Sequence, residues 1–171
     1  VATALTIGFG APADLPVSWA VEMTRGFETE CAHVGAHIAG GDVTSSDVII
    51  LAVTAMGDAV RPVLRSGALP GDVVAYAGRL GLAAAGFAAL SRGFRSPKAA
   101  VEAHRVPHPP YAAGPQAARA GATAMTDVSD GLIADLGHIA DASGVAIDLD
   151  SSAFEITEPI QAVSSALGAD P

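Results

Sequence analysis

The chain has 171 residues, half of them hydrophobic, and a formal net charge of −9 with only 9 lysines and arginines. This length suits one domain or parts of two. The shortage of basic residues argues against a nucleic-acid-binding surface. The most apolar run, residues 80–90, is shorter than the ~18 residues of a membrane span. The single cysteine, Cys31, excludes an internal disulfide and, with no signal-peptide pattern at the start, favours a reducing cytoplasm.

The first elements along the chain are a strand and a helix. Residues 2–9, rich in threonine and apolar side chains, predict the strand. Residues 16–34 predict an amphipathic helix, because apolar residues recur every three or four positions and place Met23, Phe27 and Cys31 on one face. We expect this face to pack on the neighbouring strands.

A short strand at residues 37–39 then leads into Gly40, Gly41 and Asp42. Paired glycines let the backbone approach a ligand closely, and a carboxylate follows them at once. The alternative is an ordinary turn before the next strand. That next strand, residues 47–57, is long and apolar, which predicts burial on both faces or a place in an oligomer interface.

The rest of the chain predicts a second α/β piece, with the boundary near residues 58–61. The expected strands are residues 60–64, 73–77, 123–128 and 145–149. The expected helices are residues 82–92, 96–104, 112–120, 132–143 and 160–167. We find no internal repeat and no low-complexity linker in the sequence.

The helix expected at residues 132–143 follows a cluster of oxygen-bearing side chains, namely Asp127, Ser129 and Asp130. Carboxylates and a hydroxyl are ligands that hard cations prefer, and helix N-terminal amides that point outward can bind a phosphate. The alternative is that Asp130 only caps the helix and Asp127 is solvated. The helical periodicity places Asp135 away from the apolar face that contains Ile139.

Three stretches, in this order, resemble the motifs of thiamine-monophosphate kinases, in the superfamily of aminoimidazole ribonucleotide synthetase. Residues 37–42 resemble the family's Gly-Gly-Asp motif, and residues 64–72 resemble its Arg-Ser-Gly-Ala and Pro-Gly-Asp turns. Residues 126–139 are similar to its Asp-x-Ser-Asp-Gly-Leu and Asp-Leu-Gly-His signature. The resemblance implies an α/β fold with mixed sheets. Residues 1–59 would be the C-terminal part of an N-terminal domain for ATP and metal binding and dimerisation. Residues 60–171 would begin the C-terminal domain.

The resemblance also implies a reaction, the Mg²⁺-assisted transfer of the γ-phosphoryl group of ATP to thiamine monophosphate in a cytoplasmic homodimer. The implied ATP-binding residues are Gly41, Asp42, Arg65 and Ser129. The implied Mg²⁺ ligands are Asp42, Asp127 and Asp130, which should converge across a cleft between the domains. The acceptor phosphate is already ionised, so no general base is needed. Val43 departs from the family, which often has threonine there.

Two alternatives to this function stay open. The first is another ATP-using member of the superfamily with a different acceptor. The second is a non-catalytic fragment that only folds and dimerises, because segments of the family are missing and the apolar strand at residues 48–56 suits a dimer interface. Neither Val1 nor Pro171 resembles a natural terminus, so we expect a fragment. The family's acceptor loop and further acidic ligands would lie outside the sequence, so we expect the fragment alone to be inactive.

Overall fold

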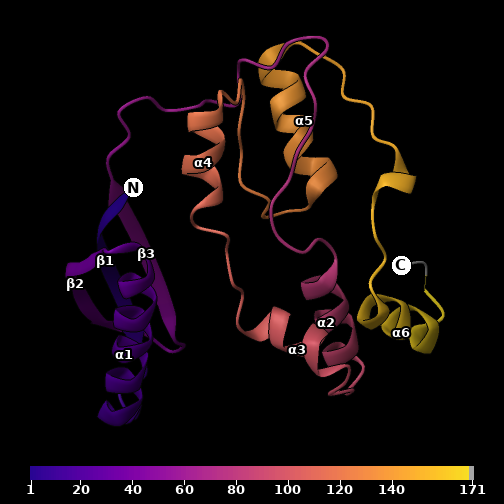
Figure 1. Ribbon diagram of the computed structural model, residues 1–171. Coiled ribbons are helices and arrows are strands. Elements are labelled where there is room, and N and C mark those ends of the chain that lie inside the picture. Colours follow the sequence, from indigo (N-terminus) through magenta and orange to yellow (C-terminus); the bar gives the residue numbers. More distant parts are fainter. Residues whose placement is uncertain (170–171) are drawn as a thin grey trace. The chain divides into compact units, whose positions relative to one another are not determined.

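The computed structural model describes residues 1–169, which fall into two compact units (Figure 1). Unit 1 consists of residues 1–62, and unit 2 begins at Val63. Each unit is described by itself below. Among the helices of residues 1–169, none has the length and apolar character needed to cross a membrane.

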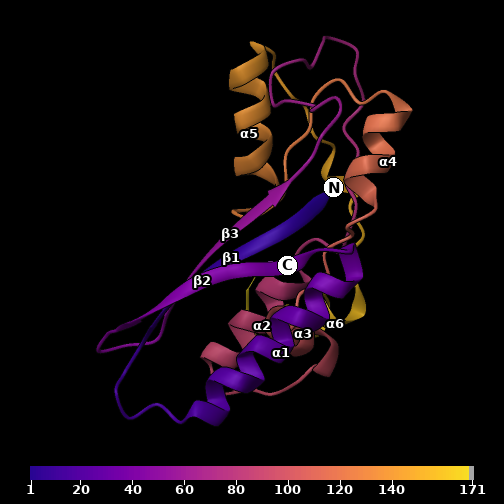
Figure 2. The same ribbon diagram turned by 90° about the vertical axis from the view of Figure 1, so that its left-hand side faces the viewer.

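Unit 1 is built on a three-stranded mixed sheet in the order β2-β1-β3. The central strand is β1 (Ala2–Ala11), with β2 (His37–Ser45) parallel on one side and β3 (Ile50–Gly57) antiparallel on the other, as Figure 2 shows. The expected short strand at residues 37–39 therefore continues through Gly40, Gly41 and Asp42. The ordinary turn considered for these residues is wrong, because their backbone stays paired with β1.

The crossover between the two parallel strands is α1 (Val17–Val34). Pro16 precedes it with extended backbone, and Gly35 ends it in the left-handed conformation that glycine adopts at low cost. Cys31 is buried and Met23 and Phe27 are half-buried, so the covered stripe of the helix is the one that the periodicity predicts.

The strand β3 is exposed along its whole length. The apolar run of this segment predicted either burial on both faces or a place in an oligomer interface. The first alternative is wrong for the chain by itself. The reason is topological, since β3 lies at the edge of a three-stranded sheet and few elements of unit 1 can cover it. Its large apolar side chains are between 43 and 52% exposed: Ile50, Leu51, Val53 and Met56.

Unit 2 has its core among three helices, α2 (Leu82–Ser91), α3 (Lys98–Arg105) and α6 (Glu158–Leu167). Leu82, Ala100 and Ile160 form this core, one side chain from each helix. A Cβ atom at Gly86 would collide with the Ala100 carbonyl oxygen, so the glycine allows α2 and α3 to approach closely.

The remaining elements of unit 2 are α4 (Ala113–Ala120), α5 (Leu132–Ser143) and the short 3-10 helix η1 (Ser151–Ala153). All five predicted helices are confirmed, whereas the four strands expected after residue 59 do not form. A strand requires a ladder of backbone bonds with a neighbour, and these segments form no such ladder. The Met125 amide, for example, donates to the Leu64 carbonyl (3.0 Å), but this single bond does not continue into strand pairing between the two segments.

Candidate phosphate-handling site

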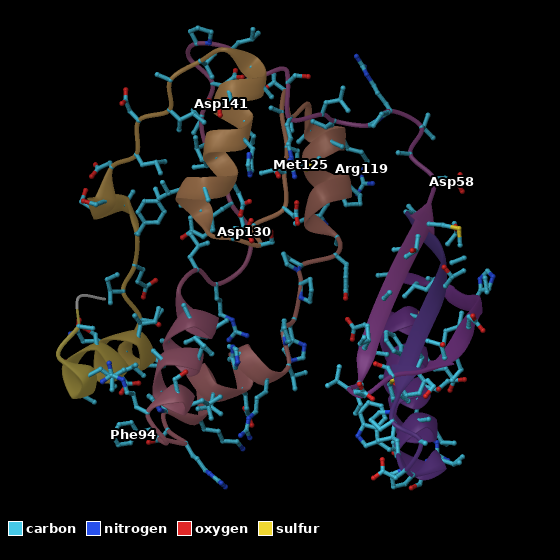
Figure 3. All side chains as sticks on the ribbon, turned by 180° about the vertical axis from the view of Figure 1, so that it is seen from behind. Asp58, Phe94, Arg119, Met125, Asp130 and Asp141 are labelled. Carbon is cyan, nitrogen blue, oxygen red and sulfur yellow. The ribbon has the colours of Figure 1, made fainter. Side chains whose placement is uncertain are left out.

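The residues predicted to handle phosphate and metal in unit 2 lie mainly in the acidic loop, defined here as residues 127–130. Asp127, Ser129 and Asp130 are all exposed, directly before α5. Figure 3 labels Asp130 at the start of α5 and Asp141 toward the other end of the helix. The exposed carboxylates can therefore meet a ligand from solvent without any rearrangement of the core.

The acidic loop is held by Asp135, a residue in the first turn of α5 that is only 3% exposed. Its Oδ2 atom accepts hydrogen bonds from three consecutive amides, those of Ser129 (2.9 Å), Asp130 (3.2 Å) and Gly131 (3.2 Å). Three donors offset the cost of burying a carboxylate. The expected placement of Asp135 away from the buried face is therefore wrong, because these bonds draw the side chain inward.

This arrangement changes two expectations about the start of α5. The N-cap residue is Gly131 and no side chain caps it, so the alternative in which Asp130 caps the helix is wrong. The amides of Ser129, Asp130 and Gly131 point at Asp135, so these three cannot bind a phosphate as outward-pointing amides would. An acidic side chain inside the first turn instead reaches back to amides before the helix, as in a capping box.

Arg65 belongs to a second loop, the arginine loop, defined here as residues 65–68. Its Nη2 atom lies 4.0 Å from Asp127 Oδ1, and the two side chains are 53% and 79% exposed. An ion pair this long and this exposed contributes little to stability. Both side chains are therefore available to a ligand. In one Mg²⁺–phosphate group, the guanidinium can bind phosphate oxygens and the carboxylate can bind the cation.

The arginine loop is held by Ser143, the last residue of α5. The Ser143 hydroxyl accepts hydrogen bonds from the amides of Gly67 (3.1 Å) and Ala68 (3.2 Å) and donates one to the Arg65 carbonyl (3.0 Å). A hydroxyl group has one donor and two acceptor sites, so all its capacity is used. Sequence reasoning did not identify Ser143, because nothing local to residue 143 marks a contact with residue 65.

The segments that carry the two loops also touch each other. A Cβ atom at Gly67 would collide with the Thr123 carbonyl oxygen, so the glycine permits this approach. The Thr123 hydroxyl donates to Asp72 Oδ2 (2.6 Å), which also accepts from the Leu69 amide (2.9 Å). These bonds, that from Thr123 first, hold the pKa of the exposed Asp72 carboxyl below its ordinary value of 3.8.

The other predicted site residues, Gly41 and Asp42, lie on β2 in unit 1. Leu5 pairs with Ile38 and Thr6 pairs with Gly40, which leaves Ala39 as the extra residue of a β-bulge. A Cβ atom at Gly41 would collide with the backbone of Ile7, so the close approach that this glycine permits is to β1. Asp42 is exposed and borders a hollow in unit 1 that Thr44 and Ile50 also line.

Exposed carboxylate oxygens are suitable Mg²⁺ donors, and Asp42, Asp127 and Asp130 all present them. Within residues 1–169, however, no three histidine, cysteine, aspartate or glutamate side chains lie close enough together to hold a metal ion. Asp42 is in unit 1, whereas Asp127 and Asp130 are in unit 2. Their convergence on one cation therefore stays a prediction.

Two protein-family models match the chain. The model of the AIR synthase related protein, N-terminal domain, matches residues 1–59, and that of the AIR synthase related protein, C-terminal domain, matches residues 70–170. The second of these by itself covers more than half of the chain.

Individual relatives are similar along nearly the whole chain. The thiamine-monophosphate kinase of Mycobacterium tuberculosis is 47% identical over 99% of this chain and 52% of its own length. Two solved structures, thiamine monophosphate kinase from Aquifex aeolicus and AaThiL complexed with AMPPCP and TMP, each superpose with a TM-score of 0.93 at 28% identity. They match 100% of this chain and 59% and 56% of their own lengths. The chain spans about half the length of the curated relatives it matches. By its motifs, its fold and these matches, it belongs to the AIR synthase related protein family and resembles the thiamine-monophosphate kinases within it.

Proposed function

We propose that the protein transfers the γ-phosphoryl group of ATP to thiamine monophosphate and so forms thiamine diphosphate. The observation that carries the proposal is the superposition of the whole chain on AaThiL complexed with AMPPCP and TMP. AMPPCP is an analogue of ATP. The 47% identity to a thiamine-monophosphate kinase adds support, because it extends over 99% of the chain.

The chemistry of the candidate residues suits this reaction. The attacking group is a phosphate oxygen that is already ionised at neutral pH, so the protein needs no general base. It needs positioning and charge neutralisation instead. We assign Gly41, Asp42, Arg65 and Ser129 to ATP binding, with Arg65 offsetting negative charge on the phosphate groups.

We assign Asp42, Asp127 and Asp130 to Mg²⁺. The ion would neutralise charge on the phosphate oxygens that it contacts. Three carboxylates in one cleft would repel one another without a cation, so nucleotide binding should require the divalent ion. The Arg65–Asp127 separation of 4.0 Å supports the assignment, because it places an anion-binding and a cation-binding side chain together on unit 2.

The assembly and location follow from the same proposal. Residues 1–59 supply part of an ATP- and metal-binding and dimerisation domain, and residues 60–171 supply the start of the second domain. We propose a homodimer through β3, whose exposed apolar side chains would otherwise face water. We place the reaction in the cytoplasm, where ATP is available and the single Cys31 stays reduced.

The test is a kinase assay on the full-length gene product with ATP, Mg²⁺ and thiamine monophosphate, with thiamine diphosphate measured by chromatography. Parallel reactions contain thiamine in place of its monophosphate, or no acceptor. We expect thiamine diphosphate to form only with thiamine monophosphate, and its formation to stop when a chelator removes Mg²⁺. Absence of transfer by folded protein that still hydrolyses ATP would favour the alternative of a different acceptor. Absence of both activities would favour the non-catalytic alternative.

A further inference from the structure

Helix α5 holds both loops of the candidate site, one at each end. Asp135 in its first turn accepts the three amides of residues 129–131, and Ser143 at its last position bonds Arg65, Gly67 and Ala68. Neither Asp135 nor Ser143 carries out a step of the reaction described above. Both act on the backbone of a loop that carries a charged, exposed side chain.

We propose that Asp135 and Ser143 are positioning residues, which together set the placement of Asp127 relative to Arg65 for Mg²⁺–ATP. The inference rests on the proposed function, because it takes these two charged side chains to act on the nucleotide. It extends that function by assigning the geometry of the site to a helix that lies outside the set of residues assigned above to ATP and Mg²⁺.

The first argument is that Arg65 and Asp127 cannot hold each other in place. Their nearest charged atoms are 4.0 Å apart, and more than half of each side chain is exposed. Such a pair is screened by water and gains little from its own attraction. Apart from a long bond from the neighbouring Thr126 hydroxyl to Asp127 Oδ1 (3.5 Å), the position of each side chain therefore follows from the backbone that carries it.

The second argument is that both backbones are fixed by bonds to the same rigid element. Asp135 is nearly fully buried, and its charged oxygen serves three adjacent amides, which leaves the acidic loop few alternative conformations. Ser143 uses its one donor and two acceptor sites on three backbone groups of the arginine loop. An α-helix transmits the relation between its ends with little flexibility.

The test compares variants of the full-length enzyme that remove each set of bonds with variants that keep them. Asp135→Ala and Ser143→Ala remove the bonds, whereas Asp135→Asn keeps a neutral acceptor and Ser143→Thr keeps the hydroxyl. Asp141→Ala is the matched control on the same helix, because Asp141 is exposed. Ser91→Ala is the control for the serine, because Ser91 ends α2 and its hydroxyl bonds only to Phe87 within that helix.

Two measurements are made on each variant that circular dichroism shows to be folded. The first is the steady-state kcat and KM for Mg²⁺–ATP. We expect kcat/KM to fall about 100-fold in Asp135→Ala and about tenfold in Ser143→Ala, since displacements near 1 Å at a reacting site can cost about 100-fold. Asp135→Asn should lose less than Asp135→Ala, Ser143→Thr should recover most of the wild-type value, and both controls should match wild type.

The second measurement is amide hydrogen exchange without nucleotide, which a loss of activity alone would not change. Exchange should accelerate at residues 129–131 in Asp135→Ala and at residues 67–68 in Ser143→Ala, with the rest of α5 unaffected. If Asp135→Ala does not fold, the kinetics and the hydrogen exchange are measured on Asp135→Asn and Ser143→Ala instead.

Faster exchange with unchanged kinetics would overturn the proposal, because the loops would then be held without any consequence for ATP. Unchanged exchange in folded Asp135→Ala and Ser143→Ala would overturn it as well. Wild-type protein without ATP turnover would instead overturn the proposed function. The exchange data would still decide whether the two side chains hold the loops.

Discussion

The Gly40–Asp42 stretch of β2 and the acidic loop are fixed by different kinds of bond. In this stretch of β2, each residue has a partner on β1, so that Gly41 lies opposite Ile7 and Asp42 opposite Gly8. In the acidic loop, the backbone has no strand beside it, and a single carboxylate from α5 accepts the amides of Ser129, Asp130 and the following Gly131.

The difference shows where each segment is vulnerable. Pairing along a sheet spreads the restraint over many backbone groups, none of which depends on a particular side chain. In the acidic loop, the amides of residues 129–131 share one acceptor side chain, and its loss would leave three part-buried amides to find water or new partners. Side-chain substitutions should therefore displace the acidic loop far more easily than the segment around Asp42.

The largest effect should follow from removing charge at the ends of these two segments. We expect Asp127→Asn and Asp42→Asn each to lower phosphotransfer by the full-length enzyme on the order of 100-fold or more, because a preorganised charge at the transferred phosphate is lost. Both side chains are exposed, so the fold should be unaffected. The measurement is kcat at saturating Mg²⁺, with circular dichroism as the check on folding.

Asp14→Asn is the matched control, since Asp14 is an exposed aspartate in the loop between β1 and α1 and belongs to neither segment. It should retain wild-type turnover. Wild-type-like turnover in folded Asp127→Asn would remove Asp127 from the site, and the same result for Asp42→Asn would remove the β2 segment from it.

A smaller effect, on stability, tests the sheet side of the comparison. We expect Gly41→Ala to destabilise unit 1 by about 1–3 kcal/mol, because the new Cβ would collide with the Ile7 backbone and force the strands apart. Gly26→Ala in α1 is the control, since its Cβ would meet nothing within 4 Å and alanine favours a helix by about 0.5–1 kcal/mol. Urea denaturation of the two variants should give midpoints on opposite sides of wild type. A Gly41→Ala midpoint at or above the wild-type value would contradict the assigned packing.

The smallest effect concerns Asp72, an exposed carboxylate that bonds a loop amide much as Asp135 does. Its folded-state pKa lies below 3.8, first because of the Thr123 hydroxyl and then because of the Leu69 amide. The stabilisation from these bonds is therefore complete above about pH 3.8 and is lost as the pH falls through the lower folded-state pKa. Thr123→Val should raise the pKa of Asp72 toward 3.8, whereas Thr123→Ser should leave it low, as carboxyl-carbon NMR titration can measure. An unchanged pKa in Thr123→Val would show that the hydroxyl does not lower it.

The sequence predicted some parts of this molecule better than others. The helices and the covered stripe of α1 could be predicted because the 3.6-residue periodicity is local to each segment. The four strands expected after residue 59 could not, because extended, β-prone residues become a strand only when a partner lies beside them. Pairing between residues far apart in the sequence leaves no local signal.

The same contrast holds within the candidate site. Asp127, Ser129 and Asp130 stood out because three oxygen-bearing side chains occur within four residues, shortly before a predicted helix. Asp135 gave a weaker signal, an acidic residue in a first helical turn that can reach back to preceding amides. Ser143 gave none, because its partners at residues 65–68 lie more than 70 positions away along the chain.

Because the two loops bond to the first and last turns of the same helix, the number of residues in α5 matters as much as their identity. Each inserted or deleted residue turns one end of an α-helix relative to the other by about 100° and shifts it by about 1.5 Å. A single insertion between Asp135 and Ser143 would thus rotate one side chain away from its loop, even if every original residue were kept. The outer face of α5 can accept many exchanges of side chain, whereas the helix should tolerate almost no change of length.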